Sequence, residues 1–147
     1  MARILVVDDR AENRDLLRVL FGYFGHDVTM SANGADAVRA ALAESPDLVV
    51  MDIAMPGMDG YAAARLMRSE RALDGVPLVA VSATGSANLE LVREAGFDAF
   101  YPLPIEPRDF VARLEPLLRE RDAAGDPTRS QLRGRSDGGV PAARPDR

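Results

Sequence analysis

The sequence predicts an α/β protein built on a doubly wound, five-stranded parallel sheet. Short apolar runs alternate five times with stretches in which apolar side chains recur at helical spacing. Most of the apolar runs show little polar alternation, which is typical of strands that helices cover on both faces. Because parallel strands joined through helices need right-handed crossovers, this alternation favours an open sheet between two helical layers.

Three of the five expected strands are rich in Val, Leu or Ile, which favour a pleated, buried surface. The expected strands are residues 3–7, 27–31, 48–52, 78–82 and 99–101. The helical stretches between them each carry a stripe of apolar side chains, and we interpret every stripe as core packing. The stripes are Leu16, Val19, Leu20, Tyr23 and Phe24; Val38, Ala41 and Leu42; Tyr61, Ala64 and Met67; Leu91, Val92 and Ala95; and Phe110, Leu114, Leu117 and Leu118.

The end of the chain departs from this pattern. Pro116 falls inside the last helical stretch, where it removes a hydrogen bond to Ala112, so we expect a kink or an early end there. From Asp122 onward the chain consists mainly of Asp, Gly, Pro, Arg and Ser and holds hardly an apolar side chain. Such a segment cannot offset the entropy of ordering. We therefore expect one domain over residues 1–121 and a disordered tail over 122–147.

Composition excludes several classes of function. The net charge of −5 argues against direct binding to nucleic acid, because phosphate backbones recruit clustered Lys and Arg. The chain has no cysteine, so disulfides, thiolate metal sites and cysteine nucleophiles are excluded. The apolar run at residues 4–7 is far shorter than a signal-peptide core or a membrane span. We therefore expect a cytoplasmic protein without membrane insertion.

Three carboxylates stand at the predicted ends of two strands. Asp8 and Asp9 follow the first strand, and Asp52 ends the third. In a doubly wound sheet of order 2-1-3-4-5, strands one and three flank the topological switch point at which ligands bind. Converging like charges need a compensating cation or proton, and an all-oxygen set favours a hard ion such as magnesium. The alternative is three separate, solvated acids that cap helices.

Four motifs make the sequence similar to a known family. They are Val-Val-Asp-Asp at 6–9, Met-Asp-Ile-Ala-Met-Pro-Gly-Met-Asp-Gly at 51–60, Ser-Ala at 82–83 and Leu-Pro-Ile at 103–105. Together they resemble the motifs of response-regulator receiver domains, the CheY-like family, over residues 2 to about 119. The resemblance implies the flavodoxin-like receiver fold.

The resemblance also implies roles for the acids. Asp52 would accept a phosphoryl group from a histidine kinase or phosphotransfer protein. Asp9, helped by Asp8, would hold Mg²⁺ together with Asp52 and the backbone carbonyl of Ala54. Magnesium suits this chemistry because it bridges carboxylate and phosphoryl oxygens and neutralises the charge that develops during transfer.

The same resemblance implies a conformational switch. Ser82 would turn its hydroxyl toward the phosphoryl oxygens, and the ring of Phe100 would move into the vacated space. Taken singly, Ser82 also suits a turn and Phe100 a core ring. Asp59 or a residue near it is expected to cap a helix after a glycine-rich turn. The only histidine, His26, follows a glycine in a loop, so we expect it at the surface without a chemical role.

One position departs from the family pattern. Where the family has Lys-Pro, this chain has Leu103-Pro104, and Leu103 offers neither charge nor hydrogen-bond donor. The resemblance implies a cis peptide between these two residues. Arg10, directly after the acidic pair, would be a substitute donor if it leaned over the site, and a plain surface arginine otherwise.

The sequence thus predicts a stand-alone phosphoacceptor that signals by contact with a downstream protein, rather than an enzyme. A binding module with phosphorylation uncoupled from conformation is the alternative. A small enzyme or cofactor-binding domain is disfavoured, because the chain shows no glycine-rich phosphate loop and no nucleophile with an adjacent base.

Overall fold

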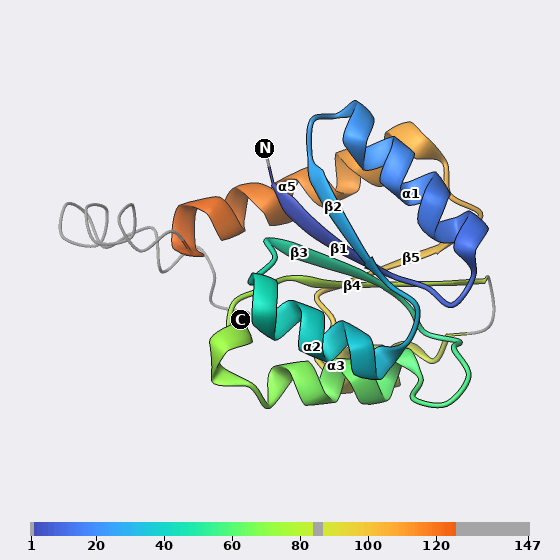
Figure 1. The fold of residues 1–147 in the computed structure, drawn as a ribbon, viewed down its shortest axis with the longest axis vertical. Coiled ribbons are helices and arrows are strands. Elements are labelled where there is room, and N and C mark those ends of the chain that lie inside the picture. Colours follow the sequence, from blue (N-terminus) through green and yellow to red (C-terminus); the bar gives the residue numbers. More distant parts are fainter. Residues whose placement is uncertain (1, 84–86, 126–147) are drawn as a thin grey trace, which may run out of the picture.

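The computed structural model describes residues 2–83 and 87–125, with residues 120–125 described by their backbone alone. Five parallel strands form one sheet in the order β2-β1-β3-β4-β5. The strands are β1 (Arg3–Val7), β2 (Asp27–Ser31), β3 (Leu48–Asp52), β4 (Leu78–Ala83) and β5 (Ala99–Leu103). The predicted doubly wound sheet and its strand order are confirmed (Figure 1).

Helices cover both faces of this sheet (Figure 1). They are α1 (Ala11–Tyr23), α2 (Gly34–Glu44), α3 (Gly60–Arg68), α4 (Leu89–Ala95) and α5 (Pro107–Gly125), with a short 3₁₀ turn, η1 (Arg71–Leu73), after α3. Buried side chains of α1 and α5, such as Phe21 and Phe110, form one core cluster with one face of the sheet. Residues of α2, α3 and α4, such as Ala41, Met67 and Val92, form a second cluster on the other face.

A close approach of backbones brings the start of α3 against the end of β3. A side chain on Gly60 would place its first carbon 2.6 Å from the carbonyl oxygen of Asp52, closer than van der Waals contact permits. The Gly60 N–H also donates to the carbonyl of Ile53 at 2.8 Å. Asp59 caps the helix, as predicted, by accepting a hydrogen bond from the Ala62 N–H at 2.9 Å. The loop after Asp52 is therefore held at both ends.

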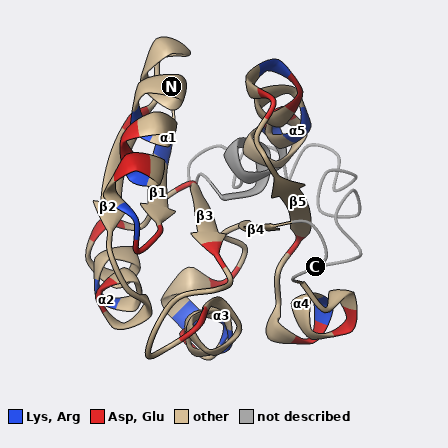
Figure 2. Cartoon of the chain, turned by 90° about the vertical axis from the view of Figure 1, so that its right-hand side faces the viewer, with Lys and Arg blue, Asp and Glu red and all other residues tan. Residues whose placement is uncertain are grey.

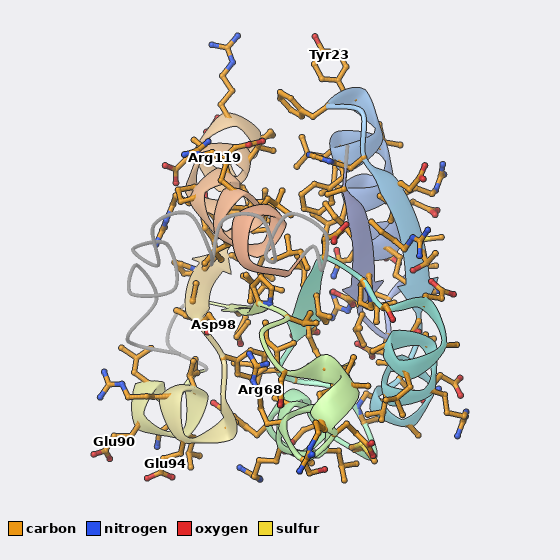
Figure 3. All side chains as sticks on the ribbon, turned by 90° about the vertical axis from the view of Figure 1, so that its left-hand side faces the viewer. Tyr23, Arg68, Glu90, Glu94, Asp98 and Arg119 are labelled. Atoms are coloured by element: carbon orange, nitrogen blue, oxygen red, sulfur yellow. The ribbon has the colours of Figure 1, made fainter. Side chains whose placement is uncertain are left out.

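An ion pair fixes the opposite edge of the sheet. Arg68, at the end of α3, donates from its Nη2 to Asp98 at 2.8 Å and from its Nε to the carbonyl of Gly96 at 2.9 Å. Asp98, just before β5, also accepts from the backbone N–H of Leu78 at 2.9 Å. Figure 3 labels Arg68 and Asp98, which lie between α3 and the start of β5. These contacts join α3, β4 and β5 at the edge remote from the acidic residues.

The last strand and the last helix are both longer than predicted. Strand β5 ends at Leu103 rather than at Tyr101. Helix α5 continues through Pro116 to Gly125, so the expected early end is wrong, whereas a kink at Pro116 stays a prediction. Leu114, Leu117 and Leu118 pack against the sheet on both sides of the proline, and this packing outweighs the roughly 3 kcal/mol that an interior proline costs. The first four residues of the predicted tail, 122–125, are helical, and 126–147 lie outside the described residues.

The interpretation of every apolar stripe as core is wrong for α1. Leu17 and Phe21 are the buried residues of this helix, whereas Leu16, Val19 and Tyr23 are exposed, Tyr23 by 83%. Tyr23 projects from the end of α1 (Figure 3). Three other side chains assigned to the core are also exposed, namely Phe24, Leu42 and Leu91. The exposed side chains of α1 form an apolar stripe, defined here as Leu16, Val19 and Tyr23.

No described helix has the length and hydropathy needed to cross a membrane.

Candidate functional site

The three predicted acids meet at the carboxyl edge of the sheet. Val7 of β1 pairs with Met51 of β3, so the residues that follow, Asp8 and Asp52, stand level on adjacent strands. One carboxylate oxygen from each of Asp8, Asp9 and Asp52 lies within 4.8 Å of the other two. Figure 2 looks onto this edge and shows the red acidic segment after β1 beside the red end of β3. The predicted convergence of the three acids is therefore present.

The first turn of α1 holds Asp8 in place. Its Oδ1 accepts a hydrogen bond from the backbone N–H of Arg10 at 2.9 Å, and its Oδ2 accepts one from the Asn13 amide at 3.2 Å. The guanidinium of Arg14 donates to the backbone carbonyl of Asp8 at 2.7 Å. Asp8 is only 3% exposed, whereas Asp9 is exposed and Asp52 is half-buried. The contacts of Asn13 and Arg14 could not be predicted from the sequence, because composition and periodicity do not give the direction of side chains within a first helical turn.

Burial makes the ionised cluster unfavourable. Burial raises the pKa of Asp52 to about 6, and the negative charges of Asp8 and Asp9 add to this effect, while the N–H of Ala54 and the charge of Arg10 oppose it. The pKa of Asp8 is also raised, mainly by burial, against the hydrogen bonds from Arg10 and Asn13. A cation between these carboxylates would remove the repulsion that the charges impose.

The donor set fits a hard divalent cation. All three converging side chains offer carboxylate oxygens, the ligand type that magnesium and calcium prefer. The Ala54 N–H donates to Asp52 Oδ1 at 3.1 Å and so orients the carboxylate. Within the described part of the chain the carbonyl of Ala54 accepts no hydrogen bond, so its oxygen is available as a further ligand. The residues present therefore match an oxygen-coordinated ion.

Ser82 lies beside Asp52 on the neighbouring strand. Asp52 pairs with Val81 of β4, which places Ser82 one residue further toward the carboxyl edge. The side chain is 1% exposed, and its Oγ has no hydrogen-bond partner among the residues that the structure describes. A buried hydroxyl without a partner is costly, so this arrangement leaves a donor unused next to the acids. The bond that this hydroxyl lacks is one that an additional group at the site would supply.

Phe100 belongs to the second core cluster rather than to the site itself. It pairs with Ala80 in the sheet, is half-buried and packs with Tyr61 and Ala87 against the cluster beneath α3 and α4. Phe100 therefore lies on β5, the strand next to the one that carries Ser82. Its position is compatible with both expectations from the sequence, a core ring and a ring that changes position.

A cavity of about 280 Å³ opens next to the acids, between α1 and the segment after β5. Its polar lining comes from Asp8, Arg10 and Asn13, and its apolar lining from Leu16, Leu17, Val81, Leu103, Pro104 and Ile105. Leu103 thus lines a space that it shares with Asp8 and Arg10. The peptide between Leu103 and Pro104 is cis, as predicted.

His26 is not the exposed surface residue that was expected. Its Nδ1 accepts a hydrogen bond from the backbone N–H of Ala2 at 3.1 Å, and its ring lies edge-on to Phe21. Burial lowers the pKa of His26. The histidine is half-buried and has a structural role at the start of β1. Asp8 and Asp9 follow the opposite end of this strand.

Comparisons with known proteins agree with this architecture. Residues 4–115 match the family described as the response regulator receiver domain. The chain is 36% identical over 121 residues to the DNA-binding response regulator MtrA of Mycobacterium tuberculosis, covering 82% of this chain and 52% of MtrA. It is 33% identical over 123 residues to the probable transcriptional regulator ycf27 of Porphyridium aerugineum, covering 83% and 50%. The chain thus spans about half the length of these curated relatives.

Two solved structures show the same fold. A CheY-like response regulator receiver domain protein from Methanospirillum hungatei superposes with a TM-score of 0.76 at 27% identity, covering 83% of this chain and 97% of that one. The receiver domain of a sensor histidine kinase from Pseudomonas aeruginosa, with a magnesium ion coordinated in its active-site cleft, gives 0.75 at 28% identity, covering 80% and 98%. The chain belongs to the family of response regulator receiver domains.

Proposed function

We propose that this chain is the phosphoryl acceptor of a two-component system, with Asp52 as the acceptor and Mg²⁺ as the cofactor. The observation that carries the proposal is the convergence of Asp8, Asp9 and Asp52 at the carboxyl edge of a receiver-domain sheet. A receiver domain similar to this chain holds magnesium in its active-site cleft, which supports the choice of ion. We also propose that the protein works in the cytoplasm, as expected from its sequence.

The proposed reaction is the transfer of one phosphoryl group. A carboxylate oxygen of Asp52 attacks the phosphorus of a phosphohistidine on a kinase or phosphotransfer protein. The phosphorus–nitrogen bond breaks, the imidazole takes a proton, and an acyl phosphate forms on Asp52. Asp8, Asp9, Asp52 and the carbonyl of Ala54 would hold the magnesium ion, which neutralises charge on the transferring oxygens. The hydrogen bonds from the Arg10 N–H and the Asn13 amide fix the orientation of the Asp8 carboxylate.

Ser82 and Phe100 are proposed to report the reaction. The unpaired, buried hydroxyl of Ser82 gains a hydrogen bond when a phosphoryl oxygen arrives beside Asp52, so the modified state is favoured by a contact that the free state lacks. Movement of this hydroxyl would alter the packing of Phe100, which lies on the neighbouring strand β5 and packs against the core cluster on that face of the sheet. The switch therefore follows from satisfying one donor.

The partners of this chain are proposed to be proteins. The apolar stripe of α1 is exposed, and Leu16 from this stripe also lines the cavity beside Asp8, so a protein docking on α1 would reach the acids. A histidine kinase or phosphotransfer protein suits this surface. The net charge of −5 does not favour direct contact with nucleic acid, so we propose output through a downstream protein.

A second candidate function rests on Leu103. Because this side chain adds no charge to the cavity beside Asp8, phosphorylation could leave the fold unchanged, and the chain would then act as a constitutive binding module. The two candidates differ in one result. In the first, a phosphoryl mimic changes the NMR shifts around Phe100, and in the second it does not.

Mass spectrometry after incubation with phosphoramidate and magnesium tests the proposed function. We expect the wild type to gain the mass of one phosphoryl group and Asp52→Asn to gain none. Asp15→Asn, which removes an exposed acid from α1, is the matched control and should behave as the wild type. A folded wild-type protein that gains no mass with this donor would overturn the proposal.

A further inference from the structure

The chain has only one kind of cationic side chain to offer to a phosphoryl group. All eighteen of its Lys and Arg residues are arginine, so any fixed positive charge at the site must come from a guanidinium. The only histidine, His26, is bound to the backbone N–H of Ala2 through Nδ1. Two arginines, Arg10 and Arg14, lie next to Asp8.

The guanidinium of Arg14 already makes a hydrogen bond at the site. It donates to the backbone carbonyl of Asp8 at 2.7 Å and is half-buried, so it braces the loop that carries the acids. Arg10 differs in two respects. It is exposed, and within the part of the chain that the structure describes its guanidinium makes no hydrogen bond or ion pair. The guanidinium N–H groups of Arg10 are therefore available to bind another group at the site.

The backbone of Arg10 is fixed even though its side chain is not. The residue is the N-cap of α1, and its N–H is hydrogen-bonded to Asp8 Oδ1 at 2.9 Å. The side chain lines the 280 Å³ cavity together with Asp8 and Leu103. Leu16, Leu103 and Ile105 give this cavity apolar walls, which suit the methylene stem of an arginine while its charged head lies near the carboxylates.

We propose that Arg10 binds the phosphoryl group carried by Asp52, its side chain lying in the cavity that it shares with Leu103. The inference rests on the proposed function of Asp52. A guanidinium presents two parallel N–H donors, which match two phosphoryl oxygens better than a single ammonium does. The contact places the cation at the N-cap of α1 instead of the end of β5.

Binding of beryllofluoride, a phosphoryl mimic, tests this contact in the full chain without turnover. We would titrate wild type, Arg10→Ala, Arg10→Gln and Arg18→Ala with beryllofluoride at fixed magnesium and follow the complex by fluorine NMR. Loss of a charge-assisted contact should weaken binding by about 10-fold or more in both Arg10 variants. Arg18→Ala removes an exposed arginine of α1 that lies outside the cavity lining and should bind as the wild type does. The glutamine variant keeps most of the stem, so a folding defect in the alanine variant alone would not remove the test.

The second arm asks whether the shared cavity explains the effect. Because residue 103 lines the same cavity, Leu103→Lys introduced into Arg10→Ala should restore a large part of the lost affinity. Magnesium affinity, measured by calorimetry without the mimic, should not fall in Arg10→Ala, since Arg10 is not a ligand. Equal beryllofluoride affinity for Arg10→Ala, Arg10→Gln and wild type would overturn the inference and leave the proposed function standing. A wild type that binds magnesium but neither beryllofluoride nor a phosphoryl group would overturn both.

Discussion

The hydroxyl oxygen of Tyr61 accepts a hydrogen bond from the backbone N–H of Asn88 at 3.0 Å. Tyr61 lies in the first turn of α3, and Asn88 is the N-cap of α4, where its side chain accepts from the N–H groups of Glu90 and Leu91. The bond therefore fastens the start of α4 to α3. Tyr61 packs against the same core cluster as Phe100, so this bond ties α4 to the part of the core that the proposed switch involves.

Replacing Tyr61 by phenylalanine should loosen the start of α4 without disturbing the core. The ring stays in place, and one hydrogen bond worth about 0.5 to 1 kcal/mol is lost. Native-state hydrogen exchange should become faster at Asn88 and in the first turn of α4. Tyr23→Phe is the control, because its hydroxyl lies on an 83% exposed side chain. Unchanged exchange at Asn88 would mean that α4 is held by its apolar contacts alone.

Much of the fold was predictable because its strands are buried between two layers of helices. The run Leu48–Asp52 was predicted to the residue, since no polar side chain interrupts it before the aspartate. The strand that begins at Ala99 is predicted to end at Tyr101, just before Pro102, but in the structure it continues to Leu103. β5 pairs only with β4, and an edge strand tolerates a proline whose missing N–H would face away from the sheet.

Helix α1 shows what periodicity leaves open. Leu16, Val19 and Tyr23 follow helical spacing along one face of α1. Leu17 and Phe21 follow the same spacing along a neighbouring face. Spacing alone does not say which of two apolar stripes packs on the sheet, and the structure buries the second. The convergence of the acids was predictable because it depends on strand ends. The contacts of Asn13, Arg14 and Tyr61 were not, because they depend on where individual side chains point.

The half-buried imidazole of His26 should make the protein less stable in mild acid. Burial lowers the pKa of His26 below its ordinary value of 6.5, and the neutral ring accepts the Ala2 N–H. Because the folded state prefers the neutral form, this contribution is complete above about pH 6.5 and is lost as the pH falls through the folded pKa. Urea unfolding of wild type and His26→Gln across this range measures it. The wild type should lose stability relative to the variant, and parallel curves would contradict the assignment.

Removing one acid from the cluster should weaken magnesium binding. Asp9 is the exposed member, so Asp9→Asn removes one anionic ligand with little effect on packing. We expect the affinity to fall by about 10-fold, measured by titration calorimetry at neutral pH. Asp15→Asn, also exposed but on the surface of α1, should bind magnesium as the wild type does. If Asp9→Asn and wild type bind equally well, the ion is held elsewhere.

The metal-free protein should gain stability from protonation of Asp52. Its pKa is raised to about 6, mainly by burial, from 3.8 in an unfolded chain. Because the folded-state pKa lies above the unfolded value, protonation of Asp52 contributes to the free energy of unfolding. This contribution is fully present below about pH 4 and is lost as the pH rises through about 6. Because Asp52 is only half-buried, solvent screening reduces the effect to the order of 1 kcal/mol.

Asp52→Asn should remove this dependence, because the amide is neutral at every pH in the range. With a chelator present, unfolding of the variant should show higher stability than wild type at about pH 8 and a smaller difference at about pH 4. Magnesium should reverse the order at the higher pH, since it stabilises the wild type by binding the ionised carboxylates that the variant has lost. A variant that is less stable than wild type at high pH without metal would show that the Asp52 carboxylate is held by contacts that outweigh its burial and the charges of Asp8 and Asp9.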